Sequence, residues 1–401
     1  MRRELTSVIW SGLGKVGTKG VAFVFSVFLA RMLTPEDFGL CGMIALFIAL
    51  ASMFAECGFS AAIVRKNNLT DRDYATVFWS QLASAVVCCA ALCLFAPAIA
   101  AFLGRSELVG ITRLVSVNVV WGALASVPYT RLRLTSRFRA ISVVDVVTSV
   151  LSGAFGLALA AKGRGVWAIV WQGFAWNALR TLLLFAAARW LPSRTFSRDS
   201  FREFFAFGWK QLAASLVNTT YSNLQALLIG RWFGAAETGL YNRAHYYIHE
   251  PGSLMQGIFT EVGYPALAEV QGDAPRMKRR FLRFAGAEAL VMSVGLGVFA
   301  LFAGEIVEFL VGARWLACVP YIRILALGAA VEPLRQFMLL PFYVKGRTDL
   351  VLKLELVEIA TAVILLFGAL PYGILAICWS KTAYHVGSFA LTGVVLWKRF
   401  R

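Results

Sequence analysis

One motif occurs twice in this chain, first as Arg31-Met-Leu-Thr-Pro-Glu-Asp-Phe-Gly-Leu40 and again, 200 residues later, as Arg231-Trp-Phe-Gly-Ala-Ala-Glu-Thr-Gly-Leu240. Similarity at a fixed offset is typical of a chain built from related structural units. Each copy follows the first long apolar segment of one half of the chain. The motif therefore predicts two related halves of six helices each. The alternative is a chance similarity between two short segments.

The composition is that of a membrane protein. Of the 401 residues, 59% are hydrophobic and only 15% are charged, and the mean hydropathy is +0.69. In soluble proteins about a quarter of the residues are charged. Twelve spans of about 20 residues would use roughly 240 positions, which leaves short connectors and no room for a soluble catalytic or nucleotide-binding domain. We therefore expect an all-α polytopic membrane protein, and not an ATP-driven pump or a large two-domain enzyme.

Hydropathy predicts twelve spans along the chain. They lie near residues 8–32, 38–62, 74–102, 108–130, 140–161, 165–189, 204–231, 239–266, 282–304, 317–343, 350–370 and 372–397. The first is expected to be a retained span and not a signal peptide, because the apolar run contains Lys15 and Lys19 and has no small-residue cleavage site.

The net charge of +17 indicates how the chain is oriented. With the N-terminus placed in the cytoplasm, the inside segments carry about three times as many lysines and arginines as the outside segments. This bias supports an even number of spans with cytoplasmic N- and C-termini. Basic loops that face an anionic leaflet are the first explanation of the charge, an acidic substrate is the second, and nucleic acid is a distant third.

The repeat and a polar, basic segment between its halves define the expected domains. We predict an N-terminal six-helix lobe over residues 1–190, a cytoplasmic linker over 191–203, and a C-terminal six-helix lobe over 204–401. Two lobes around a central cavity are the default architecture of a transporter that alternates between inward-open and outward-open states.

No cofactor or metal site is predicted. The seven cysteines lie in apolar runs without paired metal-ligand spacing, and we interpret them as small packing residues. A G-x-G-x-x-G pattern from Gly12 to Gly17 lies within a predicted span, where no βαβ unit can form. The chain has no P-loop and no nucleophile elbow, so the sequence predicts no catalytic residue.

Three lysines lie at costly positions in predicted spans. A charge near the bilayer centre costs about 2.5 to 3.5 kcal/mol on insertion scales. Lys15 and Lys19 are four residues apart and share a helical face, and Lys210 lies at a comparable depth in the seventh span. We predict that they line a cationic cleft, open to the cytoplasm, for a phosphate or diphosphate head group. Snorkelling to the interface is the alternative, mainly for Lys15 and Lys210.

Two pairs of opposite charges are also buried in predicted spans. Asp145 in the fifth span and Arg180 in the sixth lie on neighbouring antiparallel helices, which predicts an ion pair. It is either a structural link or a pair that exchanges partners when an anionic substrate arrives. Glu332 and Arg335, three residues apart in the tenth span, are expected to neutralise each other.

The eighth span contains His245, His249 and Glu250 directly before Pro251. Proline removes a helical hydrogen bond, so we expect a kink and hydrated backbone there. A carboxylate beside an imidazole is a candidate relay for protons or sodium ions, and a helix-packing cluster is the alternative. The twelfth span adds two weaker candidates of the same kind, Lys381 and His385.

The seventh span is unusually polar between Val217 and Gln225. Its hydrogen-bonding residues are Asn218, Thr219, Thr220, Tyr221, Ser222, Asn223 and Gln225. Such a stretch in a membrane helix predicts a water-filled cavity, and its hydroxyl, amide and aromatic groups suit sugar hydroxyls and pyranose faces. Hydrogen bonding between helices is the competing explanation.

Several stretches together carry a family resemblance. They are Leu29 to Gly39, Gly58-Phe-Ser-Ala-Ala62, Val77-Phe-Trp79, Gly165-Val-Trp-Ala168, Phe207-Gly208, Ile229-Gly-Arg231 with Gly239-Leu-Tyr241, and Tyr264-Pro-Ala-Leu-Ala268 followed by Gln271-Gly-Asp273. They resemble the polysaccharide-exporter family, specifically Wzx-type oligosaccharide flippases of the colanic-acid-exporter kind. The resemblance covers about residues 1–285, and the remainder matches only in hydropathy.

The resemblance implies membership of the multidrug/oligosaccharidyl-lipid/polysaccharide superfamily. The implied activity is the movement of undecaprenyl-diphosphate-linked oligosaccharide from the inner to the outer face of a bacterial cytoplasmic (inner) membrane, for lipopolysaccharide or exopolysaccharide biosynthesis. The implied partners are this lipid-linked sugar, membrane lipids, and a polysaccharide polymerase and glycosyltransferases, but no nucleic acid. The family offers no strict catalytic signature, so the site residues rest on the physical argument above.

The sequence therefore predicts a non-enzymatic flippase that works by alternating access. The three lysines and Arg180 would bind the anionic head group, and the polar stretch would bind sugars. The ion-coupling candidates are His245, His249, Glu250 and Asp145. One alternative is a cation-coupled drug exporter, which predicts an acidic cavity lining. The other is a membrane-embedded oligosaccharide polymerase or ligase, which would need a large external loop where the predicted loops are short.

Overall fold

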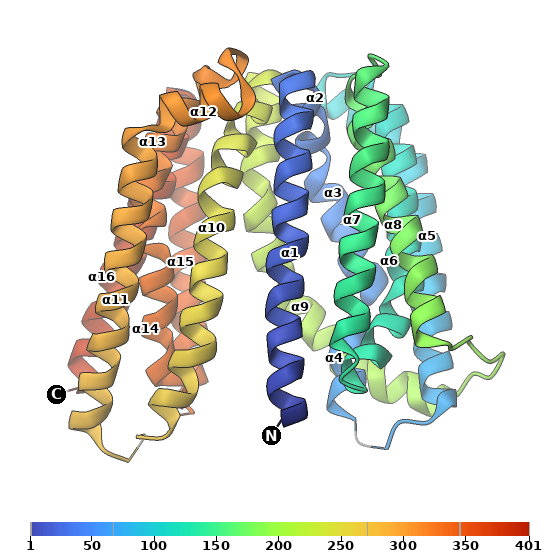
Figure 1. The fold of residues 1–401 in the computed structure, drawn as a ribbon, viewed down its shortest axis with the longest axis horizontal. Helices are drawn as coiled ribbons and strands as arrows, with labels where there is room; N and C mark the ends of the chain where they lie inside the picture. The colour runs from blue at the N-terminus through green and yellow to red at the C-terminus, as the bar shows by residue number, and fades with distance from the viewer. Residues whose placement is uncertain (1, 67, 271, 345, 401) are drawn as a thin grey trace. The chain divides into compact units, whose positions relative to one another are not determined.

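The computed structural model describes the backbone of residues 2–66, 68–270, 272–344 and 346–400. Side chains are described over the same ranges except at residues 2–16, 214, 258, 274, 348, 399 and 400. Within these ranges every regular element is a helix (Figure 1). The side chain of Lys15, one of the predicted head-group ligands, lies outside the described residues.

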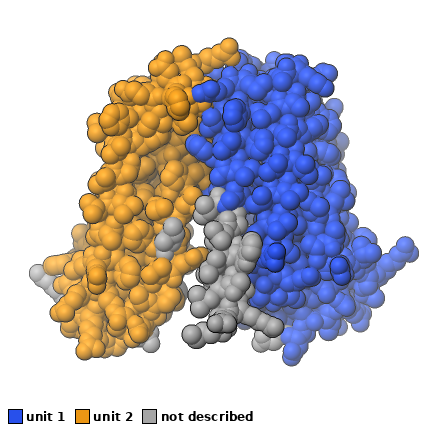
Figure 2. All heavy atoms as spheres, in the orientation of Figure 1, with its two compact units in different colours: residues 1–239 blue, residues 240–401 orange. Residues whose placement is uncertain are grey.

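The chain forms two compact units, residues 1–239 and 240–401 (Figure 2). Unit 1 contains α1 (Arg2–Met32), α2 (Pro35–Met43), α3 (Ala45–Glu56), α4 (Phe59–Arg65), α5 (Asp71–Leu103), α6 (Leu108–Leu134), α7 (Phe138–Ala161), α8 (Val166–Ala188), α9 (Arg198–Phe233) and the first turn of α10 (Ala235–Ala268). Within it, α1 packs against α7, α5 against α6, and α8 against both α6 and α7.

Unit 2 contains the rest of α10 and the C-terminal helices. These are α11 (Ala274–Leu301), α12 (Ala303–Val311), the 3-10 helix η1 (Ala313–Cys318), α13 (Val319–Ala329), α14 (Glu332–Val344), α15 (Thr348–Ala369), the 3-10 helix η2 (Leu370–Tyr372) and α16 (Ile374–Phe400). Here α16 packs against α13, α14 and α15, and α11 packs against α13 and α14.

The prediction of an all-α polytopic membrane protein is confirmed, and helices cover each of the twelve predicted spans, although the second is divided among α2, α3 and α4 and the tenth among η1, α13 and α14. By length and composition, six helical segments of the described chain can cross a membrane, and α1 with α2 makes a seventh if this pair, bent by 119°, is one span. The helices α9 and α10, which carry most of the predicted polar site residues, are not among them. The predicted lobe boundary at residues 191–203 stays a prediction.

The first copy of the repeated motif shapes the turn between α1 and α2. Pro35 takes the first position of α2, where its missing N–H costs no helical hydrogen bond. Thr34 and Asp37 form a capping box, in which the Thr34 backbone N–H donates to Asp37 Oδ2 at 2.9 Å and the Asp37 N–H donates to Thr34 Oγ1 at 3.3 Å. These local bonds start a new helix directly after α1 ends.

The two copies of the motif meet at a close crossing between α2 and the first turn of α10. A Cβ atom added at Gly39 would lie 1.7 Å from the carbonyl oxygen of Ala235. Reciprocally, a Cβ added at Gly239 would lie 1.8 Å from the carbonyl oxygen of Pro35. Both pairs are offset by 200 residues, so equivalent positions of the repeat face one another. Only glycine permits this backbone approach.

Helix α9 packs along α2, α3 and α4 and so belongs to unit 1. At one end of this contact, a Cβ at Gly208 would lie 2.2 Å from the Cys57 carbonyl oxygen. Nearby, Lys66 Nζ donates to Glu203 Oε2 at 2.9 Å and to Asp73 Oδ1 at 3.2 Å. These hydrogen bonds, chiefly the one to Glu203, raise the pKa of the Lys66 ammonium above its ordinary value. The loop after α4 is thereby tied to α5 and α9.

Unit 2 has an apolar core and a buried ion pair. Phe281 on α11 stacks on Phe337 of α14, with ring centroids 5.5 Å apart. The guanidinium of Arg335 on α14 forms a two-pronged ion pair with the carboxylate of Glu358 on α15, in which Nε lies 3.2 Å from Oε1. Thr392 Oγ1 on α16 lies 3.3 Å from the same Oε1. Three helices of unit 2 are joined at this point.

Candidate functional site

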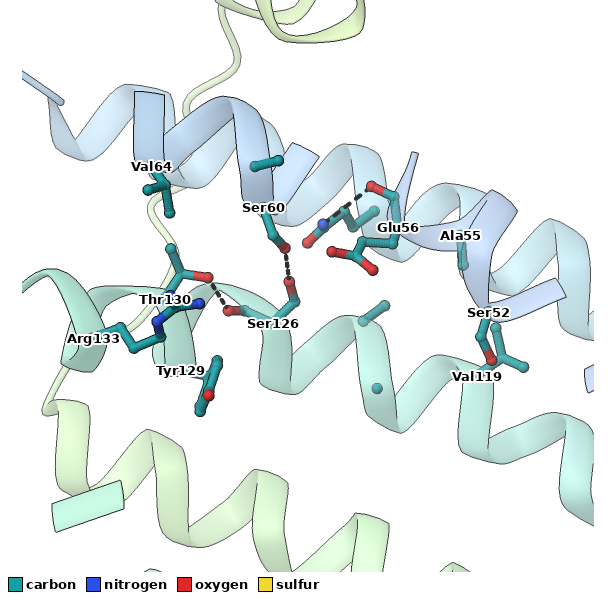
Figure 3. Close-up of a pocket in the computed structure, with 14 residues that line it drawn as sticks. Ser52, Ala55, Glu56, Ser60, Val64, Val119, Ser126, Tyr129, Thr130 and Arg133 are labelled. Carbon is teal, nitrogen blue, oxygen red and sulfur yellow. Dashed lines mark hydrogen bonds between the residues drawn. The ribbon is translucent and has the colours of Figure 1, made fainter. Parts of the chain in front are cut away.

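Unit 1 contains a pocket of about 600 Å³ between α3 and α4 on one side and α6 on the other, with Gln81 of α5 also in its lining (Figure 3). It lies beside a break in the second predicted span. Cys57 and Gly58 both have left-handed backbone conformations, with φ of 49° and 67°, so α3 ends at Glu56 and a new helix begins at Phe59. Broken membrane helices are tolerated where the backbone is buried in protein or lines a water-filled cavity.

Two side chains at this break supply hydrogen-bond acceptors to the pocket. Gln81 on α5 is fully buried, and its Nε2 donates to the backbone carbonyl of Glu56 at 3.3 Å. Its Oε1 has no hydrogen-bond partner among the described residues, and a buried polar group left without one costs about 1 to 3 kcal/mol. The Glu56 carboxylate lies between α3 and α6 in Figure 3 and makes no ion pair with a described side chain.

Hydroxyl groups complete the polar lining. Ser60 Oγ and Ser126 Oγ lie 3.0 Å apart across the pocket. Thr130 Oγ1 donates instead to the backbone carbonyl of Ser126 at 2.9 Å. Tyr129 and Arg133 follow on the same helix, α6, and Arg133 is the only cation among the residues that line the pocket.

The predicted ion pair between Asp145 and Arg180 is present and adjoins this pocket. Arg180 Nε donates to Asp145 Oδ1 at 2.7 Å, and both side chains are about four-fifths buried. The guanidinium also lies over the rings of Tyr129 and Trp176, 5.1 and 5.2 Å from their centroids. Since Tyr129 lines the pocket as well, the ion pair lies behind one of its walls. Whether it binds substrate stays a prediction.

Two of the predicted lysine ligands, Lys19 and Lys210, lie on different helices of unit 1. Lys19 is half-buried on α1, which packs mainly against α7, whereas Lys210 is exposed on α9, which packs mainly against α3. The shared cationic cleft stays a prediction.

The polar stretch of α9 has two faces. Thr219 Oγ1 lies 3.5 Å from the sulfur of Met53 on α3, and Asn223 Nδ2 donates to the Thr219 carbonyl at 2.9 Å. Asn218 and Ser222 are exposed, and Ser222 Oγ donates to the Asn218 carbonyl at 2.8 Å. Farther along, Gln225 is buried and Tyr221 is half-buried. The stretch thus contacts α3 through Thr219 and exposes Asn218 and Ser222 on another face, and its binding of sugars stays a prediction.

All three histidines of the chain converge in unit 2. The rings of His245 and His249 on α10 are stacked with centroids 5.1 Å apart, and Tyr241 stacks on His245 at 6.3 Å. On α16, Lys381 Nζ lies 3.5 Å from the Tyr241 hydroxyl oxygen, and His385 Nε2 lies 3.8 Å from Oε2 of Glu332 on α14. His249 interacts electrostatically with both Glu332 and His385. We call His245, His249, Glu332, Lys381 and His385 the histidine cluster.

Sequence reasoning was wrong about the partners of Glu332 and Arg335. They do not neutralise each other: Arg335 pairs with Glu358, and Glu332 faces His385. Their side chains leave α14 toward different neighbours, α15 for Arg335 and α16 for Glu332. His385 and Lys381, which the sequence offered as weaker candidates, are therefore central to the histidine cluster. Glu250 is half-buried on α10, and its carbonyl accepts a hydrogen bond from Ser253 Oγ at 3.0 Å.

Glu288 on α11 is a residue that the sequence analysis missed. It is 0% exposed, and neither carboxyl oxygen has a hydrogen-bond partner within the described chain. A carboxyl group in this state destabilises the fold, and ionisable residues inside membrane spans are usually functional. The sequence contains a signal for this residue, because Glu288 is the only charged residue in the apolar stretch between Phe284 and Gly304.

We expect Glu288→Leu to raise the stability of the protein and to lower its transport activity. Removing a buried, unpartnered carboxyl group should increase the free energy of unfolding by about 1 to 3 kcal/mol, and stabilising changes at functional sites commonly reduce activity. Thermal unfolding in detergent and export by the variant in cells would measure the two effects. A less stable variant with unchanged export would contradict a functional role.

A helical membrane bundle with buried, partly unpaired polar clusters is the architecture of a membrane transporter. Residues 28–320 match the family model described as "Polysaccharide biosynthesis protein", so the chain belongs to this family. It is similar to the teichuronic acid biosynthesis protein TuaB of Bacillus subtilis (strain 168), with 26% identity over 97% of this chain and 81% of that protein. It is also 25% identical to the succinoglycan biosynthesis transport protein ExoT of Rhizobium meliloti (strain 1021), over 81% of this chain and 66% of ExoT.

Solved structures show the same fold. One titled "Lipid II flippase MurJ, inward closed conformation" superposes with a TM-score of 0.78 at 12% identity, over 96% of this chain and 87% of that chain. The predicted membership of the polysaccharide-exporter family is therefore confirmed.

Proposed function

We propose that this protein is a non-enzymatic flippase that moves polyprenyl-diphosphate-linked oligosaccharide across a bacterial cytoplasmic membrane by alternating access, for surface polysaccharide biosynthesis. The observation that carries the proposal is the family match over residues 28–320 in a chain that folds as a polytopic helical bundle. The relatives named for polysaccharide biosynthesis and its transport, and the fold shared with a lipid II flippase, support it. Cytoplasmic termini, and a polymerase and glycosyltransferases as partners, belong to the same proposal.

The proposed substrate contacts follow from the charged and hydrogen-bonding side chains of the chain. Lys19, Lys210 and Arg180 would bind the diphosphate, and the exposed face of the polar stretch in α9 would contact sugars. The lipid tail would stay in the bilayer. The coupling ion would bind at the histidine cluster of unit 2 or at Glu250 beside it, and Asp145 would act with Arg180.

The proposal is tested by a leaflet-resolved measurement of lipid-linked oligosaccharide in a strain that lacks this gene. We expect the intermediate to accumulate on the cytoplasmic leaflet and to reach the outer leaflet again when the gene is restored. Accumulation of unpolymerised repeat units on the outer leaflet would instead indicate a polymerase or ligase. Normal glycan export combined with loss of drug efflux would indicate a drug exporter.

For the head group, we expect Lys19→Ala to lower transport about tenfold or more. A hydrogen bond to a charged group is worth about 1.5 to 3 kcal/mol, and 1.4 kcal/mol corresponds to a factor of ten. Lys19→Arg, which keeps the charge, should retain more activity than Lys19→Ala. Lys162→Ala, which removes an exposed lysine at the end of α7, is the control. Equal transport by the Lys19→Ala variant and the wild type would exclude Lys19 from head-group binding.

A further inference from the structure

Of the described residues that the sequence assigned to substrate, only Arg180 adjoins the pocket of unit 1, through its contact with Tyr129. None of the proposed lysine ligands and none of the polar residues of α9 lines it. It is lined by residues of α3, α4, α5 and α6, and its volume of about 600 Å³ is in the range of small-molecule sites. The break at Cys57 and Gly58 ends α3 at Glu56, where the Glu56 carboxylate lies in the pocket.

The break between α3 and α4 is held in place by contacts with α9 and α5. Gly58 has a positive φ of 67°, and a Cβ there would lie 2.5 Å from the Gly208 carbonyl oxygen of α9. The Gln81 amide then fixes the free end of α3, because its Nε2 donates to the Glu56 carbonyl. Because this hydrogen bond occupies the NH₂ group, Gln81 is left with a buried Oε1 that has no donor in the part of the chain that the structure describes. The geometry is that of a site prepared for a hydrogen-bond donor from a ligand.

The polar lining is rich in acceptors. Gln81 Oε1 can only accept hydrogen bonds, and so can both oxygens of an ionised Glu56 carboxylate. The hydroxyls of Ser60 and Ser126 share one hydrogen bond with each other. A matching ligand must carry several hydrogen-bond donors, and it must be large enough to fill a cavity far larger than one ion. Polyhydroxylated molecules meet this requirement because each hydroxyl both donates and accepts. A phosphate group could pair with Arg133, which also lines the pocket, but it would offer only acceptors to Gln81 Oε1 and to the Glu56 carboxylate.

We propose that this pocket binds a sugar residue of the transported glycan, with its hydroxyl groups donating to Gln81 Oε1 and to the Glu56 carboxylate. The Ser60 and Ser126 hydroxyls would complete the contact, and the apolar lining of Ala55, Val119 and Ala123 would face the ring carbons. This inference rests on the proposed function and gives it a subsite within unit 1. It makes Glu56 and Gln81 determinants of which glycan is accepted.

The test compares the binding of two lipids by the purified full chain in nanodiscs. One is the lipid-linked oligosaccharide extracted from the deletion strain, and the other is undecaprenyl diphosphate without sugar. We expect the wild type to bind the glycosylated lipid more tightly. Gln81→Met and Glu56→Ala should each lose about tenfold in affinity for the glycosylated lipid and keep the wild-type affinity for the sugar-free lipid. Gln336→Met in unit 2 is the matched control and should bind both lipids as the wild type does.

Each outcome bears on a different claim. Variants that keep the wild-type preference for the glycosylated lipid would overturn the sugar subsite and leave the proposed function intact. A wild type that binds neither lipid would overturn both. Thermal unfolding of each variant identifies misfolding, and the milder Glu56→Gln, which keeps one carbonyl acceptor, should fall between Glu56→Ala and the wild type. Binding of a hydrophobic cation that competes with the glycosylated lipid and is lost in Glu56→Gln would overturn the sugar assignment.

Discussion

Gly39→Ala and Gly239→Ala are each expected to destabilise the protein by about 3 kcal/mol, at the upper end of what overpacking costs. The reason is the close crossing of α2 and α10, where the new methyl group would meet a backbone carbonyl oxygen at 1.7 or 1.8 Å. A backbone oxygen cannot move aside as a flexible side chain can, so one helix must shift. Thermal unfolding of the purified protein in detergent, followed by tryptophan fluorescence, measures the effect.

The matched control for this prediction is Gly257→Ala, which lies on α10 as Gly239 does. A Cβ at Gly257 meets nothing within 4 Å, so this change should stabilise the helix by up to about 1 kcal/mol. The double variant Gly39→Ala with Gly239→Ala should cost less than the sum of the single changes, because both displace the same pair of helices. Equal stability of Gly39→Ala and Gly257→Ala would show that the crossing is looser than described.

Breaking the buried ion pair of unit 2 should have the second large effect. Glu358 is 3% exposed and Arg335 is 7% exposed. Glu358→Leu leaves a buried guanidinium without its partner, which typically costs about 3 to 5 kcal/mol. Arg335→Met leaves the carboxylate unpaired and should cost a similar amount. Unfolding midpoints of the two variants in detergent would measure these losses.

The double variant Arg335→Met with Glu358→Leu distinguishes the contribution of the charges to stability from the contribution of packing. Replacing both members of a buried pair by apolar residues is often neutral, so the double variant should recover most of the stability that either single change removes. The hydroxyl of Thr392 then loses its acceptor, which leaves a small residual cost. If the double variant is as unstable as the sum of the single ones, the residues act through packing and not through their charges.

Much of the fold could be predicted from the sequence because the responsible signals are local. Long apolar segments with short connectors define the helices. The motif around Gly39 and Gly239 predicted two related halves, which stays a prediction, and it did not predict that its two copies contact each other. The pair of Asp145 and Arg180 was accessible for the same reason, since neighbouring spans joined by a short loop must pack as antiparallel helices.

The parts that escaped prediction depend on packing between distant segments. Arg335 has an acidic neighbour three residues away, yet the contact of α14 with α15 gives it Glu358 as partner. The pocket of unit 1 depends on a left-handed pair at Cys57 and Gly58, and only one of the two is a glycine. Its key acceptor, Gln81, looks like an ordinary polar residue near the start of a span. No local sequence pattern indicates which of the polar groups contact substrate.

The reciprocal contact of the two glycine motifs has the pairing pattern of a twofold interface. Gly39 meets residue 235 while Gly239 meets residue 35, so one pair of helices carries two equivalent contacts. Sliding α2 along the first turn of α10 would therefore disturb both contacts together, which resists displacement in either direction.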